Sequence, residues 1–298
     1  MNRLISSVAR RFSIFSATNL KAVRELTGAP ISKCKEALDK STSLELAIEY
    51  LKERNLSFAQ KKEDKETKEG FFSIQKTPAE MIALSLLCET DFVARNEAFL
   101  DFVQQASKLA ASNKVCETQQ VETLEHEGYP LSHALAQMTG KFQEKIKFGQ
   151  LVRETLRPDQ TLGLYVHNGP SETVGNAMSY VVLKSDNKPP EIQALADELA
   201  VHVFCRTPEF LAKSEVSEAK IAEIKTELES RMKGKPQAAQ EKAFEAKIND
   251  FFANHVLSEQ EIEFGEAETV SKELDRVGKQ VGAKIEIEKF AIHKIKGN

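Results

Sequence analysis

The chain has 298 residues, of which 41% are hydrophobic and 29% charged, and its formal net charge is −4. This composition excludes wholesale disorder, and the length suffices for one large domain or several small ones with hydrophobic cores. The longest apolar stretch, residues 81–88, is far shorter than the roughly 20 residues that a membrane-spanning helix needs. We therefore expect a soluble globular protein that contacts no membrane and, without an excess of basic residues, no nucleic acid directly.

The first stretch of the chain differs in composition from the rest. Residues 1–17 carry three arginines among apolar and serine residues, and the first acidic residue is Glu25. Short segments that are basic, rich in serine and free of acidic residues are typical of mitochondrial presequences. We predict a transit peptide over residues 1–17, cleaved near residues 10–13, and a location in the mitochondrial matrix. The alternative is a frayed basic N-terminus.

Residues 18–58 contain three apolar patterns with helical spacing. In the first, Leu20, Val23 and Leu26 recur at every third position before a break at residues 27–30. Residues 42–45 have the spacing of a capping box, which predicts the start of the third helix. A three-helix module of this size has only a marginal core, so we expect it to serve as an interaction module.

A run that is charged at nearly every position follows this module and predicts a solvated linker over residues 59–70. Beyond the linker, short apolar runs alternate with amphipathic stretches. Strands are predicted near residues 71–74, 81–88, 148–156, 162–167, 178–184 and 284–288. Helices are predicted near residues 99–110, 190–204 and 269–281.

Because the predicted strands come in pairs with helices to one side, we expect the α+β class rather than a doubly wound sheet. The core would consist of two α+β subdomains, residues 71–168 and 169–298. Two charged amphipathic helices over residues 215–253, joined at residues 234–236, predict a helical hairpin inserted into the second subdomain.

No sequence pattern of a known active site occurs in the chain. It has no phosphate-binding glycine loop, no nucleophile elbow and no metal-ligand spacing among its six histidines and four cysteines. We therefore expect no metal and no cofactor, and we expect Cys34, Cys88, Cys116 and Cys205 to be buried as small hydrophobic residues. An enzyme whose active site is assembled from distant residues stays open as an alternative.

One segment, Thr90-Asp91-Phe92-Val93, lies between an apolar strand and a helix. At such a turn, Asp91 and Phe92 would present a negative charge beside a large aromatic ring. Periodicity alone favours the alternative that Phe92 packs into the core while Asp91 caps the helix.

This segment resembles the Thr-Asp-Phe-Val signature of the elongation factor Ts family. Thr27-Gly28-Ala29 with Cys34-Lys35-Glu36-Ala37-Leu38 is similar to a motif of the ubiquitin-associated-like module at the N-terminus of that family. His202-Val203 with Pro208-Glu209-Phe210-Leu211 is similar to a helix end of the family's core. The three matches follow the order of the family, and the N-terminal leader indicates its mitochondrial form.

The resemblance implies a nucleotide exchange factor rather than an enzyme. Its partner would be mitochondrial elongation factor Tu, GDP-bound or nucleotide-free, the GTPase that delivers aminoacyl-tRNA. Asp91 and Phe92, flanked by Thr90 and Val93, would enter the G domain of the partner beside its bound magnesium. Since magnesium neutralises the nucleotide phosphates, loosening the ion would release GDP.

The resemblance also implies that Arg24 and Lys35 of the N-terminal module contact the partner, together with His167 of the second half of the core. The alternative for His167 is a hydrogen-bonded imidazole at the end of a strand. The family's Gly-Glu-Asn segment after a helix is replaced here by Gln143-Glu144-Lys145.

The apolar stripes of the predicted hairpin look wide enough for one neighbouring helix only. A lasting dimer usually needs roughly 800 Å² of surface per subunit, so we predict a monomer when free and a one-to-one complex with the partner. A scaffold that keeps this fold but binds another partner, for instance on the mitochondrial ribosome, is the second functional hypothesis.

Overall fold

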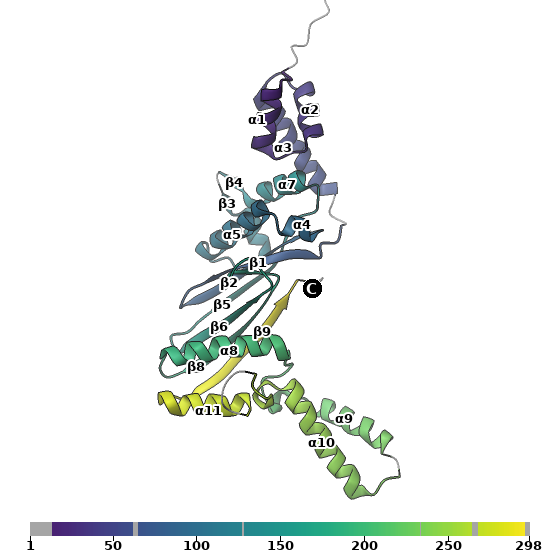
Figure 1. Ribbon diagram of the computed structural model, residues 1–298, viewed down its shortest axis with the longest axis vertical. Helices are drawn as coiled ribbons and strands as arrows, with labels where there is room; N and C mark the ends of the chain where they lie inside the picture. Colours follow the sequence, from purple (N-terminus) through teal and green to yellow (C-terminus); the bar gives the residue numbers. More distant parts are fainter. Residues whose placement is uncertain (1–13, 62–64, 127, 233, 264–267, 296–298) are drawn as a thin grey trace, which may run out of the picture. The chain divides into compact units, whose positions relative to one another are not determined.

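The computed structural model describes residues 14–61, 65–126, 128–232, 234–263 and 268–295 (Figure 1). Most of the predicted transit peptide, with its cleavage point, and the centre of the predicted linker lie outside these residues. The chain forms two compact units: residues up to Ser73 with Ile82–Val152, and Ile74–Met81 with residues from Arg153 onward. The sequence instead predicted a boundary after residue 168. The predicted α+β class is confirmed.

The first unit begins with three helices, as predicted: α1 (Ala17–Thr27), α2 (Ile31–Lys40) and α3 (Leu44–Lys61). The Ser16 hydroxyl caps α1 by accepting from the Asn19 amide at 3.0 Å, and Gly28 ends it in the left-handed conformation. Their small core consists of Val23, Ala29, Cys34, Ala37, Leu38, Ala47 and Leu51. Leu26 is an exception to the predicted apolar stripe, since it is 69% exposed.

The predicted linker is shorter than its charge pattern suggested. Helix α3 continues to Lys61, and strand β1 (Glu69–Lys76) begins before residue 70, so both elements take residues from it. Long charged and amide side chains are good helix formers, and they do not by themselves end a helix.

The main sheet has the strand order β5-β2-β1-β7, with β2 (Glu80–Cys88), β5 (Lys147–Thr155) and β7 (Val174–Gly175) beside β1. Strand β2 is buried along nearly its whole length, which explains its unbroken apolar run. Helix α5 (Glu97–Ser112) packs on this sheet: the rings of Phe102 and Phe148 are 5.9 Å apart, and the Ser73 and Ser107 hydroxyls are 2.8 Å apart.

Several short elements of the first unit were not predicted. They are α4 (Asp91–Ala94), α6 (Thr118–Thr123), the strand pair β3 (Glu125–His126) and β4 (Tyr129–Pro130), and α7 (Leu131–Phe142). Helix α7, which packs against α3, buries Leu131, Ala136, Thr139 and Gly140. Its sequence nevertheless carries the apolar spacing of a helix, at Leu131, Leu135, Met138 and Phe142.

The second unit contains an antiparallel sheet of the order β6-β8-β9, built from β6 (Gln160–His167), β8 (Ala177–Ser185) and β9 (Ile285–Lys294). Helices α8 (Pro190–Arg206) and α11 (Val270–Val281) share one hydrophobic core with Val181 and Leu183 of β8, so both cover the same face (Figure 1). Strand β9 runs six residues beyond its predicted end at residue 288.

The predicted hairpin consists of α9 (Glu218–Arg231) and α10 (Gln237–His255), between the short 3₁₀ helices η1 (Lys213–Glu215) and η2 (Leu257–Glu259). Its two ends meet, because the Phe210 and Glu209 amides both donate to the His255 carbonyl and Leu257 donates to the Phe210 carbonyl. The hairpin is thus an insertion that leaves and rejoins the unit at one place.

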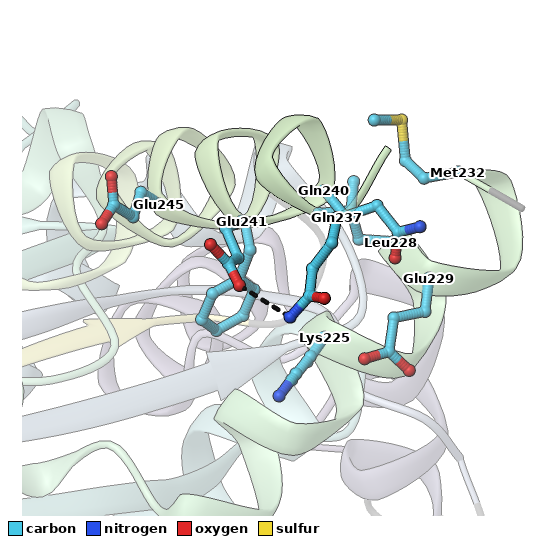
Figure 2. Close-up of a pocket in the computed structure, with 9 residues that line it drawn as sticks. Lys225, Leu228, Glu229, Met232, Gln237, Gln240, Glu241 and Glu245 are labelled. Carbon is cyan, nitrogen blue, oxygen red and sulfur yellow. Dashed lines mark hydrogen bonds between the residues drawn. The ribbon is translucent and has the colours of Figure 1, made fainter. Parts of the chain in front are cut away.

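The two apolar stripes of the hairpin bury each other less completely than predicted. Only Ile224 is buried on α9, and no residue is buried on α10. Leu228, Met232 and Phe244 line an open groove of about 650 Å³ that they share with Lys225, Gln237 and Glu241 (Figure 2). The long polar side chains between the helices keep this groove accessible to water.

Candidate functional site

The candidate site is the turn between β2 and α5, where residues 91–94 form the single-turn helix α4. Thr90 precedes it in extended conformation. Val93 and Ala94 are buried, whereas Asp91 is exposed and Phe92 is 84% exposed. The alternative that Phe92 packs into the core is therefore wrong, because Val93 and Ala94 occupy the buried side of the turn.

Two carboxylates tie this turn to the segment that follows α7. Glu144 Oε2 accepts from the amides of Thr90 at 3.0 Å and Glu89 at 3.2 Å, and Glu144 Oε1 accepts from the Thr90 hydroxyl at 2.7 Å. In return, the Lys145 amide donates to Glu89 Oε1 at 2.6 Å. The departure from the family's Gly-Glu-Asn pattern thus keeps Glu144, whose side chain contacts the turn.

Cys88 lies under the turn, and its thiol donates to the Thr90 carbonyl at 3.1 Å. Burial, helped by the charge of Glu144, raises the pKa of the Cys88 thiol to about 12, so this thiol stays neutral. Cys34 is also buried as predicted, but the predictions for Cys116 and Cys205 are wrong, since both are exposed. Cys116 lies in a loop, and Cys205 falls off the buried stripe of α8.

Arg24 and Lys35 lie on the consecutive helices α1 and α2, and both are exposed. Within the described residues, neither forms an ion pair, in contrast to Lys33, whose ammonium lies 3.6 Å from the Glu36 carboxylate. Leu26 and Ile31, on either side of the turn that joins the two helices, are exposed apolar residues. Sequence analysis missed them because exposure does not follow from apolar spacing alone.

His167 is the last residue of β6 and belongs to the second unit. Its Nδ1 shares a hydrogen bond of 3.0 Å with the Tyr165 hydroxyl, and its ring lies against Phe204, with centroids 4.5 Å apart. The imidazole is half-buried and hydrogen-bonded. His167 thus has the geometry of the alternative given in the sequence analysis, a hydrogen-bonded imidazole at the end of a strand.

His202, part of the third sequence match, is completely buried. The Glu263 amide donates to its Nδ1 at 3.3 Å, so Nε2 carries the proton and donates to Gln260 Oε1 at 3.0 Å. Burial lowers the pKa of His202 below its ordinary value of 6.5. This histidine therefore joins α8 to the segment after η2, a structural role.

Among the described residues, no group of three or more histidine, cysteine, aspartate or glutamate side chains has a geometry that could hold a metal ion. No helix of the described part is long and apolar enough to cross a membrane. Asp91 and Phe92 are exposed side by side on a turn that Val93, Ala94 and Glu144 anchor to the protein.

Comparison with known proteins identifies a family. A family model described as elongation factor TS matches residues 89–295, more than half of the chain. Elongation factor Ts of Chlamydia muridarum is 31% identical over 289 residues, which cover 95% of this chain and 99% of that protein. The Rickettsia bellii and Rhizobium etli proteins of the same name are 31% and 29% identical, each over 280 residues that cover 92% of this chain and 90% of the relative.

Fold, turn and comparisons together define a translation elongation factor. The chain belongs to the elongation factor Ts family. The family match begins at Glu89, so it includes both the turn and Glu144.

Proposed function

We propose that this protein is the guanine-nucleotide exchange factor of mitochondrial elongation factor Tu. The observation that carries the proposal is the 84% exposure of Phe92 beside Asp91 on a turn whose other two residues are buried. Large aromatic side chains are normally shielded from water, and they are enriched where a partner surface covers them. A bulky ring and a negative charge suit insertion next to a bound cation.

In the proposed mechanism, Asp91 and Phe92 enter the G domain of the partner and displace the groups that hold its magnesium. The ion bridges the phosphates and neutralises them, so its loosening leaves their charge uncompensated and GDP departs. By linkage, a factor that weakens nucleotide binding is itself bound more weakly by the nucleotide-loaded partner. GTP binding would therefore release the factor, and no covalent bond is broken.

Contacts outside the turn would contribute affinity. Arg24 and Lys35 are exposed cations without an ion pair among the described residues, and Leu26 and Ile31 add apolar surface on the same helices. His167 is proposed with them, although its hydrogen bond with Tyr165 would have to persist or be exchanged on binding.

The test is the release of fluorescent mant-GDP from purified mitochondrial elongation factor Tu in a stopped-flow instrument. Acceleration that saturates with the concentration of this protein is the expected result. Binding without acceleration would favour the scaffold hypothesis. Consumption of the nucleotide itself would indicate an enzyme.

The mitochondrial matrix is the proposed location, on the strength of the basic, acid-free composition of residues 1–17. Residues 1–24 fused to a fluorescent reporter are expected to direct it into the matrix, with loss of about 12 to 18 residues, as a short presequence would. Cytosolic fluorescence with an intact N-terminus would contradict this location.

A further inference from the structure

The orientation of α4 cannot come from the helix itself. A helix of four residues bears the entropic cost of nucleation but has too few hydrogen bonds to offset it. On its C-terminal side, burial of Val93 and Ala94 holds the turn. On its N-terminal side, the chain is held by hydrogen bonds from a segment that lies more than 50 positions away in the sequence.

We infer that Glu144 is a positioning residue, whose carboxylate fixes the direction in which Asp91 and Phe92 are presented. This inference rests on the proposed exchange function. Glu144 accepts from two successive amides and from one hydroxyl, all belonging to Glu89 and Thr90. Because Thr90 directly precedes Asp91, fixing its backbone fixes the start of the helical turn.

The contacts run in both directions, which limits rotation of either segment. Glu144 holds residues 89–90, while the Glu89 carboxylate accepts from the Lys145 amide. Hydrogen bonds that involve a charged acceptor are stronger than those between neutral groups. Within the described residues Glu144 forms no ion pair, and its three side-chain hydrogen bonds all go to residues 89–90.

The backbone before Glu144 has an unusual conformation that serves the same arrangement. Gln143, directly after α7, has φ 57° and ψ 25°, a left-handed conformation that residues other than glycine rarely adopt. Its side-chain amide donates to the Gly140 carbonyl at 2.5 Å. Strained conformations of this kind persist where the surrounding structure requires them, and here the next residue reaches the turn.

Two substitutions distinguish a positioning role of the Glu144 carboxylate from a requirement for its negative charge. In Glu144→Gln, the amide oxygen can accept from the two backbone amides while the NH₂ group donates to the Thr90 hydroxyl. In Glu144→Ala, three donors lose their acceptor. The glutamine variant should therefore preserve the turn, and the alanine variant should release it.

The first experiment uses the free protein. Since the chain contains no tryptophan, Phe92→Trp introduces a single tryptophan at the tip of the turn. Adding Glu144→Ala is expected to lower its fluorescence anisotropy, whereas Glu144→Gln and a control change at the exposed Glu122, Glu122→Ala, leave it unchanged. Unchanged anisotropy in the alanine variant would overturn the inference, whatever the fate of the exchange function.

The second experiment measures mant-GDP release with Phe92 intact. Glu144→Ala should lower the maximal exchange rate about tenfold, because small misplacements of an acting group are costly. Its apparent affinity for the partner should change less, and Glu144→Gln should restore the rate. If the alanine variant does not fold, Glu144→Asp, which withdraws the carboxylate by one methylene, takes its place and should lose rate severalfold.

The outcomes are distinguishable. A wild-type protein that fails to accelerate release contradicts the proposed function, but the anisotropy still reports on the turn. A Glu144→Ala variant with lowered anisotropy and a wild-type exchange rate would overturn the positioning role. Equal loss in the alanine and glutamine variants would do the same, because it would show a requirement for charge rather than geometry.

Discussion

At the scale of single residues, two phenylalanines ten positions apart have opposite environments. Phe92 is 84% exposed, whereas Phe102 is 7% exposed and stacks on Phe148. Phe92→Ala is expected to lower the exchange rate about 10- to 100-fold, since truncating a central interface aromatic costs about 2 kcal/mol or more of binding energy. Stopped-flow release of mant-GDP measures the rate, and the melting temperature should stay unchanged.

Phe102→Ala provides the matched control. Removing this buried ring should lower the free energy of unfolding by about 3 to 5 kcal/mol, measured by urea denaturation.

The effects of Asp91→Ala and Phe92→Ala on the exchange rate should not be additive, since neighbouring residues act on the same partner site. A large drop in the melting temperature of Phe92→Ala would contradict the exposure on which the proposal depends.

A second prediction at this scale concerns pH. Burial lowers the pKa of His202, so the folded protein binds its proton only at a lower pH than the unfolded chain does. Stability from His202 is therefore complete above about pH 6.5 and declines as the pH falls below that value. His293, whose pKa burial and the nearby Lys289 also lower, contributes with the same sign.

Urea midpoints at pH 7.5 and pH 5.5 measure this effect. The wild-type protein should lose more stability between the two values than His202→Gln, which cannot take up a proton. Equal losses in both proteins would show that His202 does not contribute to the pH dependence.

At the scale of elements, the contact of α8 with β6 depends on one glycine. A Cβ atom added to Gly163 would lie 1.8 Å from the Ala196 carbonyl oxygen, far closer than a side chain can approach a backbone carbonyl. The Leu164 amide also donates to Asp197 Oδ1 at 3.0 Å, so the helix and the strand are joined at this point. The close approach brings the apolar stripe of α8 onto the sheet.

Gly163→Ala is therefore expected to force α8 away from β6 and to lower the free energy of unfolding by about 2 to 4 kcal/mol, the range of severe overpacking. Chemical denaturation monitored by circular dichroism tests it. Glu198→Ala, on the exposed side of α8, is the control and should change stability by less than about 0.5 kcal/mol. A Gly163→Ala protein as stable as the control would contradict this packing.

At the scale of the whole molecule, the expected oligomeric state depends on how much apolar surface the hairpin exposes. Its groove with Leu228, Met232 and Phe244 is rimmed by charged and amide side chains (Figure 2). This apolar surface is small beside the roughly 800 Å² per subunit of a stable interface. We expect a monomer near 33.3 kDa for the full chain in light scattering at micromolar concentration, and a one-to-one complex with the partner.

The control replaces residues 213–255 by a short linker, which is feasible because Phe210 and Val256 are bridged to each other. A mass near twice that of one chain, abolished by this replacement, would contradict the prediction. It would show that the hairpin is part of a subunit interface.

The sequence by itself determined the class of fold and the place of the candidate turn. The unbroken apolar run of β2, the stripe of α5 and the capping-box spacing before α3 are local patterns, and each is followed by the expected element. Local pattern suffices here because the period of a buried face is a property of one helix or strand. Helix α7 was not predicted, although Leu131, Leu135, Met138 and Phe142 have the same kind of helical spacing.

Only the tertiary structure decided which side chains of the turn face water and what holds them. Periodicity favoured a buried Phe92, but Val93 and Ala94 take the buried positions. The partnership of Glu144 with Thr90 spans 54 positions and has no local signal. Burial and hydrogen bonding at the turn depend on elements far away in the sequence that pack against it. Which elements these are follows from the packing of the whole unit, not from any single segment.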